Sequence, residues 1–229
     1  MNLLALDTSS NACTVALQHG GSVLERHRVE ARVHTKILLP LVAELLDEAG
    51  IGIANLDAIV LGNGPGSFIG LRIAASFAQG LAYAAGLPVV PVSSMRAIAA
   101  EVVDTESASA VVVAQDARMG EVYLGCYLQA AETGLQPLAA ERLQGPAEIH
   151  ELESSGRQDW VAAGAGWDSL PGLLANNGAW IGSTSPVRYP RGRFLLQLGL
   201  PAFAAGAGVA PEKLELAYLR HKVAEIPAS

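Results

Sequence analysis

Residues 62–72 read Gly62-Asn63-Gly64-Pro65-Gly66-Ser67-Phe68-Ile69-Gly70-Leu71-Arg72, and this glycine-rich stretch decides the fold of the first half of the chain. It follows an apolar run and precedes an alanine-rich stretch of helical character, so it joins a strand to a helix. Free backbone N–H groups at such a helix start can hold an anion. Alternatively, the glycines only permit a tight turn and close packing. The stretch ends in Arg72 rather than Lys-Ser or Lys-Thr, so it is not the Walker pattern, and the structural role is favoured.

Strands and helices alternate on both sides of this loop. In the first half we expect strands at 3–7, 13–17, 22–30 and 89–92, a helix from Thr35 to Glu48 that Gly50 stops, a helix from about Gly70 to Ala85 capped by Ser67, and a helix near 94–103. In the second half we expect helices at 146–153, 167–175 and 194–205 and a strand at 160–163. The tail residues 216–220 carry an aromatic and apolar patch that could tie the tail to the body.

The second half repeats the beginning. An apolar strand at 112–116 ends in Asp116, turns, and returns through 121–128, as the opening strand ends in Asp7, turns, and returns through 13–17. Such internal symmetry indicates a duplicated lobe. We therefore expect an α/β protein with two mixed-sheet lobes, residues 1–105 and 106–229, and with the tail of the second lobe packing back.

Composition excludes several classes of protein. The chain has 229 residues, 51% of them hydrophobic, and a formal charge of −7, which argues against unaided binding to nucleic acid. Its two cysteines are too few for a disulfide scaffold. Its apolar runs have the length of strands rather than of a membrane span, so we expect a cytoplasmic protein that does not bind a membrane.

The ends of the two repeated strands form a candidate nucleotide site. Asp7, Thr8 and Ser9 combine a carboxylate with hydroxyls, which in two-lobed folds can hold Mg²⁺ and phosphate, and Asp116 could face them from the second lobe. The alternative is that both carboxylates cap their own turns. A small ATP-dependent phosphotransferase using Asp7 and Asp116 is thus one functional hypothesis.

The spacing of other reactive residues argues against two classes of enzyme. No two of the five histidines stand three or four residues apart, as a chelating helical face requires, so we expect no metal site. Ser67 lies outside any Gly-x-Ser-x-Gly pattern, so a serine peptidase is improbable. Neither spacing therefore identifies a catalytic residue.

Two surfaces could meet partners. The apolar residues at 37–46 fill an arc of roughly 200° on their helix, about twice what one core-facing stripe needs, which suggests that something else covers one flank. The alanines of the following helix permit close helix-to-helix approach, although core packing also explains them. Arg188, Arg191 and Arg193 form a basic cluster that could contact RNA or an acidic partner, or simply be a solvated loop.

Five motifs together resemble the TsaB family, also called YeaZ. They are the first strand through Asp7-Thr8, the His34-Thr35 helix start, the loop at 62–72, the stretch Asp116-Ala-Arg-Met-Gly-Glu-Val-Tyr123, and the terminal Tyr218-Leu-Arg220. The resemblance covers essentially the whole chain in order. Ile69 stands where threonine is expected in the family's loop pattern.

The resemblance implies a fold similar to the acetate kinase, actin and Hsp70 class. It implies a non-catalytic scaffold that acts in the cytoplasm with a TsaD-like catalytic subunit and a TsaE-like ATPase. Together they transfer threonylcarbamoyl from its adenylate to N6 of adenosine 37 in tRNAs that read codons beginning with A. TsaD would carry the metal and perform the transfer, and tRNA would be met only within the complex.

The resemblance also implies roles for particular residues. The first-lobe helices would form a homodimer when the chain is alone, or the heterodimer with TsaD. Accordingly, we expect a partner interface at His34, Leu38, Leu41, Val42, Leu45, Ala74, Ala78 and Ala82. Gly64, Gly66, Ser67, Gly70 and Arg72 would form a structural loop. The chain would have no cofactor of its own, with ATP or ADP possible at the partner junction and at most a vestigial nucleotide site at Asp7, Thr8, Ser9 and Asp116.

Overall fold

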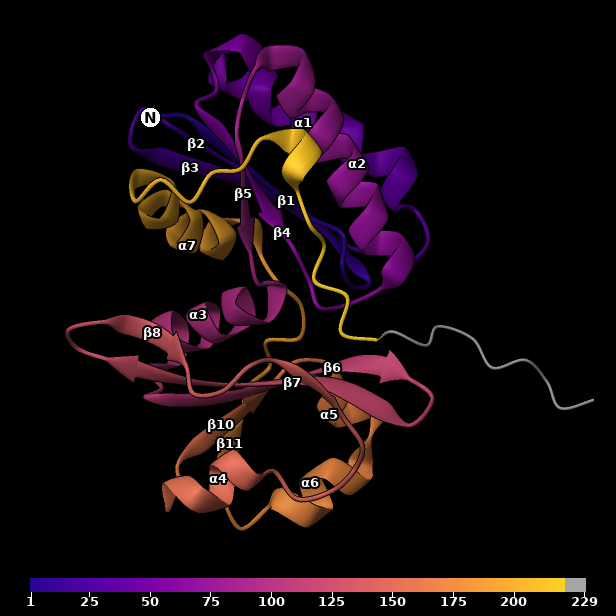
Figure 1. Ribbon diagram of the computed structural model, residues 1–229, viewed down its shortest axis with the longest axis vertical. Helices are drawn as coiled ribbons and strands as arrows, with labels where there is room; N and C mark the ends of the chain where they lie inside the picture. Colours follow the sequence, from indigo (N-terminus) through magenta and orange to yellow (C-terminus); the bar gives the residue numbers. More distant parts are fainter. Residues whose placement is uncertain (221–229) are drawn as a thin grey trace, which may run out of the picture.

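The computed structural model describes residues 1–220, which form two lobes, each built on a mixed β-sheet (Figure 1). The first sheet has the strand order β3-β2-β1-β4-β5. Its strands are β1 (Leu3–Asp7), β2 (Ala12–His19), β3 (Ser22–Val29), β4 (Ala58–Gly62) and β5 (Val89–Val92). The three opening strands pair antiparallel through short turns, and β4 and β5 add in parallel, as strands that return through helices do.

The second sheet repeats this pattern. Its order is β11-β10-β6-β7-β8, and β9 (Arg142–Gln144) also pairs with β7. Its strands are β6 (Ala110–Arg118), β7 (Glu121–Ala130), β8 (Gly134–Pro137), β10 (Trp160–Ala163) and β11 (Ile181–Thr184). Read from β8 to β11, it has the same directions as the first sheet: two antiparallel pairs, then two parallel pairs. The duplicated two-lobed α/β fold expected from the sequence is confirmed.

Helices cover the outer faces of both sheets. On the first lobe these are α1 (His34–Ala49) and α2 (Phe68–Ala85), whose buried side chains pack on Leu4, Leu6 and Val15 of the sheet. On the second lobe they are the shorter α4 (His150–Ser155), α5 (Gly166–Ser169) and α6 (Pro171–Asn177). The described chain also has two 3₁₀ turns, Ile53–Asn55 and Pro211–Lys213.

The last helix of each lobe packs on the sheet of the other lobe. Helix α3 (Ser94–Glu106) follows the first sheet but contacts β6, β7, β8 and β10, whereas α7 (Gly192–Ala204) follows the second sheet but contacts all five strands of the first. Figure 1 shows both helices between the two sheets. One apolar cluster therefore runs through both lobes, from Leu3 and Val60 to Val111 and Tyr127. The domain boundary between residues 105 and 106 stays a prediction. Helix α7 belongs to the second half by sequence but packs on the sheet of the first lobe.

The bounds of three helices differ from those expected. Thr35 does not cap α1, because the Val33 carbonyl accepts the Lys36 and Ile37 amides and the helix starts at His34 without a side-chain cap. The helix expected at 146–153 begins only at His150. The helix expected at 167–175 is broken before Pro171, which lacks an N–H and starts a new helix instead.

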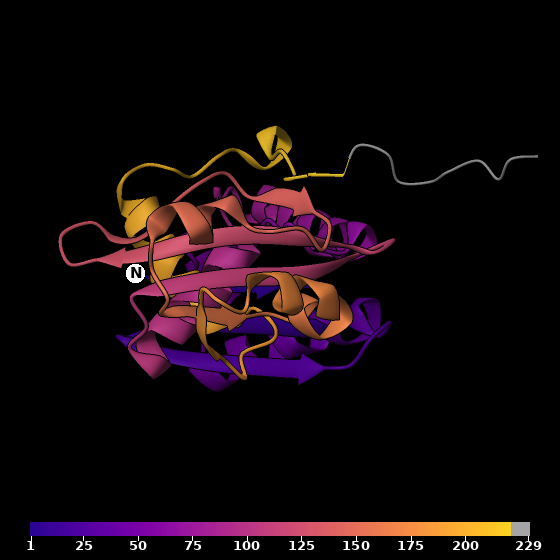
Figure 2. The same cartoon turned by 90° about the horizontal axis from the view of Figure 1, so that it is seen from below.

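The chain returns to the first lobe after α7. Residues 205–220 run past α2 and end between the lobes (Figure 1), and Figure 2 shows that the segment lies along one side of the molecule. The segment is held by Gln79 Nε2 donating to the Pro211 carbonyl at 2.9 Å and by Asn63 Nδ2 donating to the Glu215 carbonyl at 3.0 Å. At its end Arg220 pairs with Glu121 of β7 at 2.6 Å, so this segment fastens one lobe to the other.

Candidate functional site

The glycine loop packs directly against the turn that follows β1. The Ser67 amide donates to the Ser9 carbonyl at 2.6 Å, and Thr8 Oγ1 donates to the Gly70 carbonyl at 2.7 Å. A Cβ added at Gly66 would lie 2.3 Å from the Ser9 carbonyl oxygen, and one at Gly70 would lie 2.0 Å from that of Thr8. The two backbones are therefore packed directly against each other.

The start of α2 and the middle of the loop have partners within the chain. Ser67 Oγ accepts the Gly70 amide at 3.2 Å, which is the N-cap expected from the sequence. The Gly64 amide donates to Ser94 Oγ at 3.0 Å, and Gly64 itself has a φ of 79°, where a side chain would be strained. These contacts favour the structural role of the loop.

Asp7 is fully buried and bonded to its own chain. Its Oδ1 accepts the Ser9 amide at 2.6 Å and the Ser9 hydroxyl at 2.7 Å, and its Oδ2 accepts the Ser94 hydroxyl. A Cβ at Gly62 would lie 1.9 Å from Oδ2, so that position admits only glycine. Burial raises the pKa of Asp7 to about 6, although the hydrogen bonds from Ser94 and Ser9 act in the opposite direction.

Asp116 closes a turn of its own. Its Oδ1 accepts the Arg118 amide at 2.8 Å, and its Oδ2 pairs with the Arg118 guanidinium at 3.0 Å. Arg118 and Met119 both have positive φ in this turn, and Arg220 supports it by donating to the carbonyls of residues 117 and 118. For both aspartates the arrangement matches the turn-capping alternative, and the nucleotide site at Asp7, Thr8, Ser9 and Asp116 stays a prediction.

The tail occupies the junction of the lobes beside the loop. Residues 217–220 lie with Gly66, Phe68 and Leu71 of the first lobe and Tyr123 of the second around a cavity of about 30 Å³. Pockets for small ligands usually measure about 300–1,000 Å³, so this cavity suits a water molecule rather than a nucleotide. Arg72 secures the tail, since its guanidinium stacks 3.9 Å from the Phe68 ring and donates to the Tyr218 hydroxyl at 3.1 Å.

The candidate metal ligands are dispersed, and the arginines of the basic cluster at 188–193 are paired with carboxylates. Within residues 1–220 no three His, Cys, Asp or Glu side chains gather as a metal site would require. Arg191 and Arg193 pair with Glu25 of β3 at 2.8 and 3.2 Å, and Arg188 pairs with Asp168 at 2.7 Å. The Glu25 side chain is 5% exposed, so two of these arginines tie α7 to the first sheet, and their contact with RNA or an acidic partner stays a prediction.

The side chains expected at the partner interface lie mostly beneath the surface of the chain, and the interface itself stays a prediction. They are all buried within the chain itself, because the apolar arc of α1 and the alanine stripe of α2 face the sheet. These side chains are His34, Leu38, Leu41, Val42, Leu45, Ala74, Ala78 and Ala82, none more than 8% exposed. They form the core beneath the two helices, and of the eight only Leu38 also lines the groove between α1 and α2.

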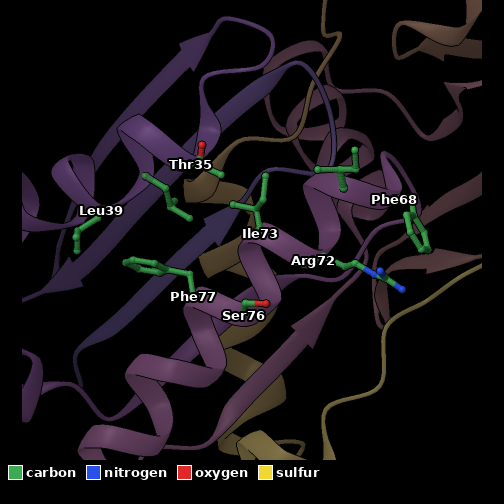
Figure 3. Close-up of a pocket in the computed structure, with 9 residues that line it drawn as sticks. Thr35, Leu39, Phe68, Arg72, Ile73, Ser76 and Phe77 are labelled. Carbon is green, nitrogen blue, oxygen red and sulfur yellow. The ribbon is translucent and has the colours of Figure 1, made fainter.

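The helices instead expose a different set of apolar side chains around a groove. The groove between α1 and α2 has a volume of about 550 Å³ and is lined by Thr35, Leu38, Leu39, Phe68, Ile69, Arg72, Ile73, Ser76 and Phe77. Figure 3 shows Leu39 and Thr35 of α1 facing Ile73 and Phe77 of α2. Leu39 is 58% exposed and Ile69 70%, while Tyr83 on α2 is 78% exposed. The wide apolar arc of α1 was the sequence signal for this surface, but it did not show which edge stays uncovered.

Helix α2 is apolar on more of its surface than the core covers. By length and composition alone α2 would suffice to cross a membrane, with a mean hydropathy of 1.2, yet it covers a sheet and carries Arg72 and Gln79. Only 33% of its residues are buried. Part of its apolar surface therefore lacks a partner within the described chain.

Comparisons with known proteins place the chain among relatives of the same length. A family described as "TsaD: tRNA N6-adenosine threonylcarbamoyltransferase" matches residues 16–176. The tRNA threonylcarbamoyladenosine biosynthesis protein TsaB of Escherichia coli is 37% identical over 98% of this chain and 96% of its own length. That of Haemophilus influenzae is 33% identical over 97% and 95%.

Two solved structures are similar to this chain over nearly its whole length. YeaZ from Pseudomonas aeruginosa superposes with a TM-score of 0.85 at 38% identity, covering 95% of this chain and 99% of that one. A second P. aeruginosa structure, described as a protein with similarity to peptidase YEAZ, gives a TM-score of 0.88 at 39% identity over 96% and 99%.

Replacing Gly70 with alanine tests the contact between the loop and the β1 turn. The Cβ of Gly70→Ala would clash with backbone, so we expect the free energy of unfolding to fall by about 3 kcal/mol. Gly80→Ala on the same helix is the matched control, because Gly80 is exposed and nothing lies within 4 Å of its Cβ. It should stabilise the protein by about 0.5–1 kcal/mol. Urea titration measures the free energy of unfolding of both variants. Equal effects of the two substitutions would contradict the close contact between Gly70 and the turn after β1.

The buried carboxyl of Asp7 predicts a pH dependence. Because the pKa of Asp7 is about 6 in the folded chain and 3.8 ordinarily, the fold binds this proton more tightly than the unfolded chain does. The contribution of Asp7 to stability is therefore lost as pH rises from about 4 through 6, by about 3 kcal/mol in all. We expect the unfolding free energy of the wild type minus that of Asp7→Asn to fall by most of this amount, about 2.4 kcal/mol, between pH 4 and 7. Urea titrations at each pH measure it, and a constant difference would show that burial does not control Asp7.

Proposed function

The chain belongs to the TsaB family of tRNA threonylcarbamoyladenosine biosynthesis proteins, and from this membership we propose that it is a non-catalytic subunit of the machinery that makes this modified nucleoside. In this role it holds a TsaD-like catalytic subunit, with a TsaE-like ATPase, for transfer of threonylcarbamoyl to N6 of adenosine 37. It meets tRNA within that complex, in the cytoplasm.

The apolar groove between α1 and α2 carries this proposal. It has a volume of about 550 Å³ and a rim of exposed Leu39 and Ile69, which single molecules in water seldom leave uncovered. The occupant we propose is the corresponding helical face of the TsaD-like subunit, which has a related fold, or a second copy of this chain when the partner is absent. Aromatic side chains and arginine, which line this groove as Phe68, Phe77 and Arg72, are enriched at protein interfaces.

The interior of the chain supports a non-catalytic role. The carboxyl of Asp7 is buried and bonded to Ser9 and Ser94, and the glycine loop is filled by the β1 turn. No observation favours the phosphotransferase hypothesis over this role. We place any ATP or ADP at the junction with the partner, because the cavity between the lobes measures only about 30 Å³.

Charged substitutions on the groove rim test the proposal. Leu39→Glu and Ile69→Glu would force a carboxylate into the interface, so we expect each to weaken association with a TsaD-like subunit at least tenfold, about 1.4 kcal/mol or more. Leu138→Glu is the matched control, since Leu138 is an exposed leucine of the second lobe.

Association is measured by titration calorimetry, with circular dichroism to check that each variant is folded. Equal affinity of wild type, Leu39→Glu and Ile69→Glu would remove the partner from this groove. Substitutions at Leu38 or Leu45 would not serve, because those side chains lie in the core and a charge there would unfold the chain.

A further inference from the structure

Most of the lysine and arginine side chains in residues 1–220 contact a partner group within the chain, but a few do not. Fourteen of its lysines and arginines lie within residues 1–220. Ten of these have a carboxylate, a carbonyl or an aromatic ring as partner: Arg26, Arg72, Arg96, Arg118, Arg142, Arg157, Arg188, Arg191, Arg193 and Arg220. Of the four others in the described chain, Lys213 stands alone, while three lie together on one short segment.

That segment, residues 28–36, joins the end of edge strand β3 to the start of α1 and carries Arg28, Arg32 and Lys36, all exposed. We call it the basic segment. Its backbone is fixed, since the Glu30 amide donates to the Asn11 carbonyl at 3.0 Å and His34 Nε2 lies 2.9 Å from the Ser10 carbonyl oxygen. Arg32 has a φ of 68°, a conformation uncommon for residues other than glycine. Arg32 therefore projects from a hydrogen-bonded loop, with Arg28 at the end of β3 on one side and Lys36 in the first turn of α1 on the other.

The electrostatics of the basic segment favour an anion. Glu30 is its one acidic residue, and the first turn of α1 that follows contains none. The helix start also lacks a side-chain cap, so the positive end of its dipole adds to the same field. The chain as a whole carries −7, so a polyanion that approaches it is repelled elsewhere and contact is concentrated at this segment.

The basic segment adjoins the proposed partner groove. Thr35 belongs to the segment and also lines the groove, and Leu39 follows one helical turn after it. A polyanion bound on the surface of a partner seated in the groove would pass beside these cations.

We infer that Arg28, Arg32 and Lys36 contact the phosphate backbone of the tRNA held by the assembled subunits, an inference that depends on the proposed function above. Guanidinium groups suit phosphate oxygens, and such contacts position a nucleic acid without reading its sequence. This chain supplies an accessory contact, and the partner carries the rest.

The experiment uses the complex of this chain with a TsaD-like subunit and a fluorescent tRNA transcript. Affinity is measured by anisotropy between 50 and 200 mM KCl for wild type and for the triple variant Arg28→Gln, Arg32→Gln, Lys36→Gln. Each lost phosphate contact lowers the slope of log K against log salt by about 0.9, so the triple variant should lose about 2.7. Its affinity for the TsaD-like subunit, measured separately, should be unchanged.

A second triple variant, Arg118→Gln, Arg157→Gln, Lys213→Gln, is the matched control because it removes the same charge from elsewhere on the surface. An equal loss in both triple variants would indicate only a long-range field and would overturn the inference. Loss of partner affinity with an unchanged tRNA slope would show that the segment binds an acidic protein surface, which also overturns it. If the wild-type chain does not assemble with the TsaD-like subunit, the proposed function itself fails, and this inference with it.

Discussion

The close approach of two backbones, the glycine loop at 62–70 and the turn at 7–9, is the constraint on which the rest of the structure depends. Three positions there, Gly62, Gly66 and Gly70, have no room for a side chain, because a Cβ would lie 1.9–2.3 Å from atoms of residues 7–9. This contact fixes where α2 begins relative to β1. Because α2 begins there, its first-turn residues Phe68, Ile69 and Arg72 line the outer groove. Arg72 also binds Tyr218 of the tail.

The two lobes behave as one body because each completes the other. Helix α3 covers the second sheet and α7 covers the first, so neither sheet has both faces buried by its own lobe. The pairs Arg191–Glu25 and Arg220–Glu121 add polar ties across the same junction. Helices and tail fill the inner junction of the lobes, and the functional surface that we propose is the outer face of α1 and α2 with its groove and basic segment.

The sequence was sufficient for the architecture because that depends on local patterns. The repeated strand, aspartate and returning strand predicted two lobes, and Ser67 was correctly identified as the cap of α2. The sequence was insufficient where a side chain binds a residue that lies far away along the chain. Arg191 and Arg193 looked available until Glu25, on β3 of the other lobe, was seen to hold them. Periodicity gave the apolar arc of α1 but could not tell that Leu38 faces the sheet while Leu39 faces water. Nor could glycine content tell whether a phosphate or a neighbouring backbone fills the loop.

Hydrogen exchange of the chain, free and with a TsaD-like subunit, tests most directly the claim that function lies on the outer helices and not in the glycine loop. The account predicts slower exchange of amides at residues 34–39 and 68–77 when the subunit is added, and no change at 7–9 or 62–66 when Mg²⁺ and ATP are added to the chain alone. Protection of 7–9 and 62–66 by Mg²⁺ and ATP, with none on α1 and α2 from the subunit, would contradict it.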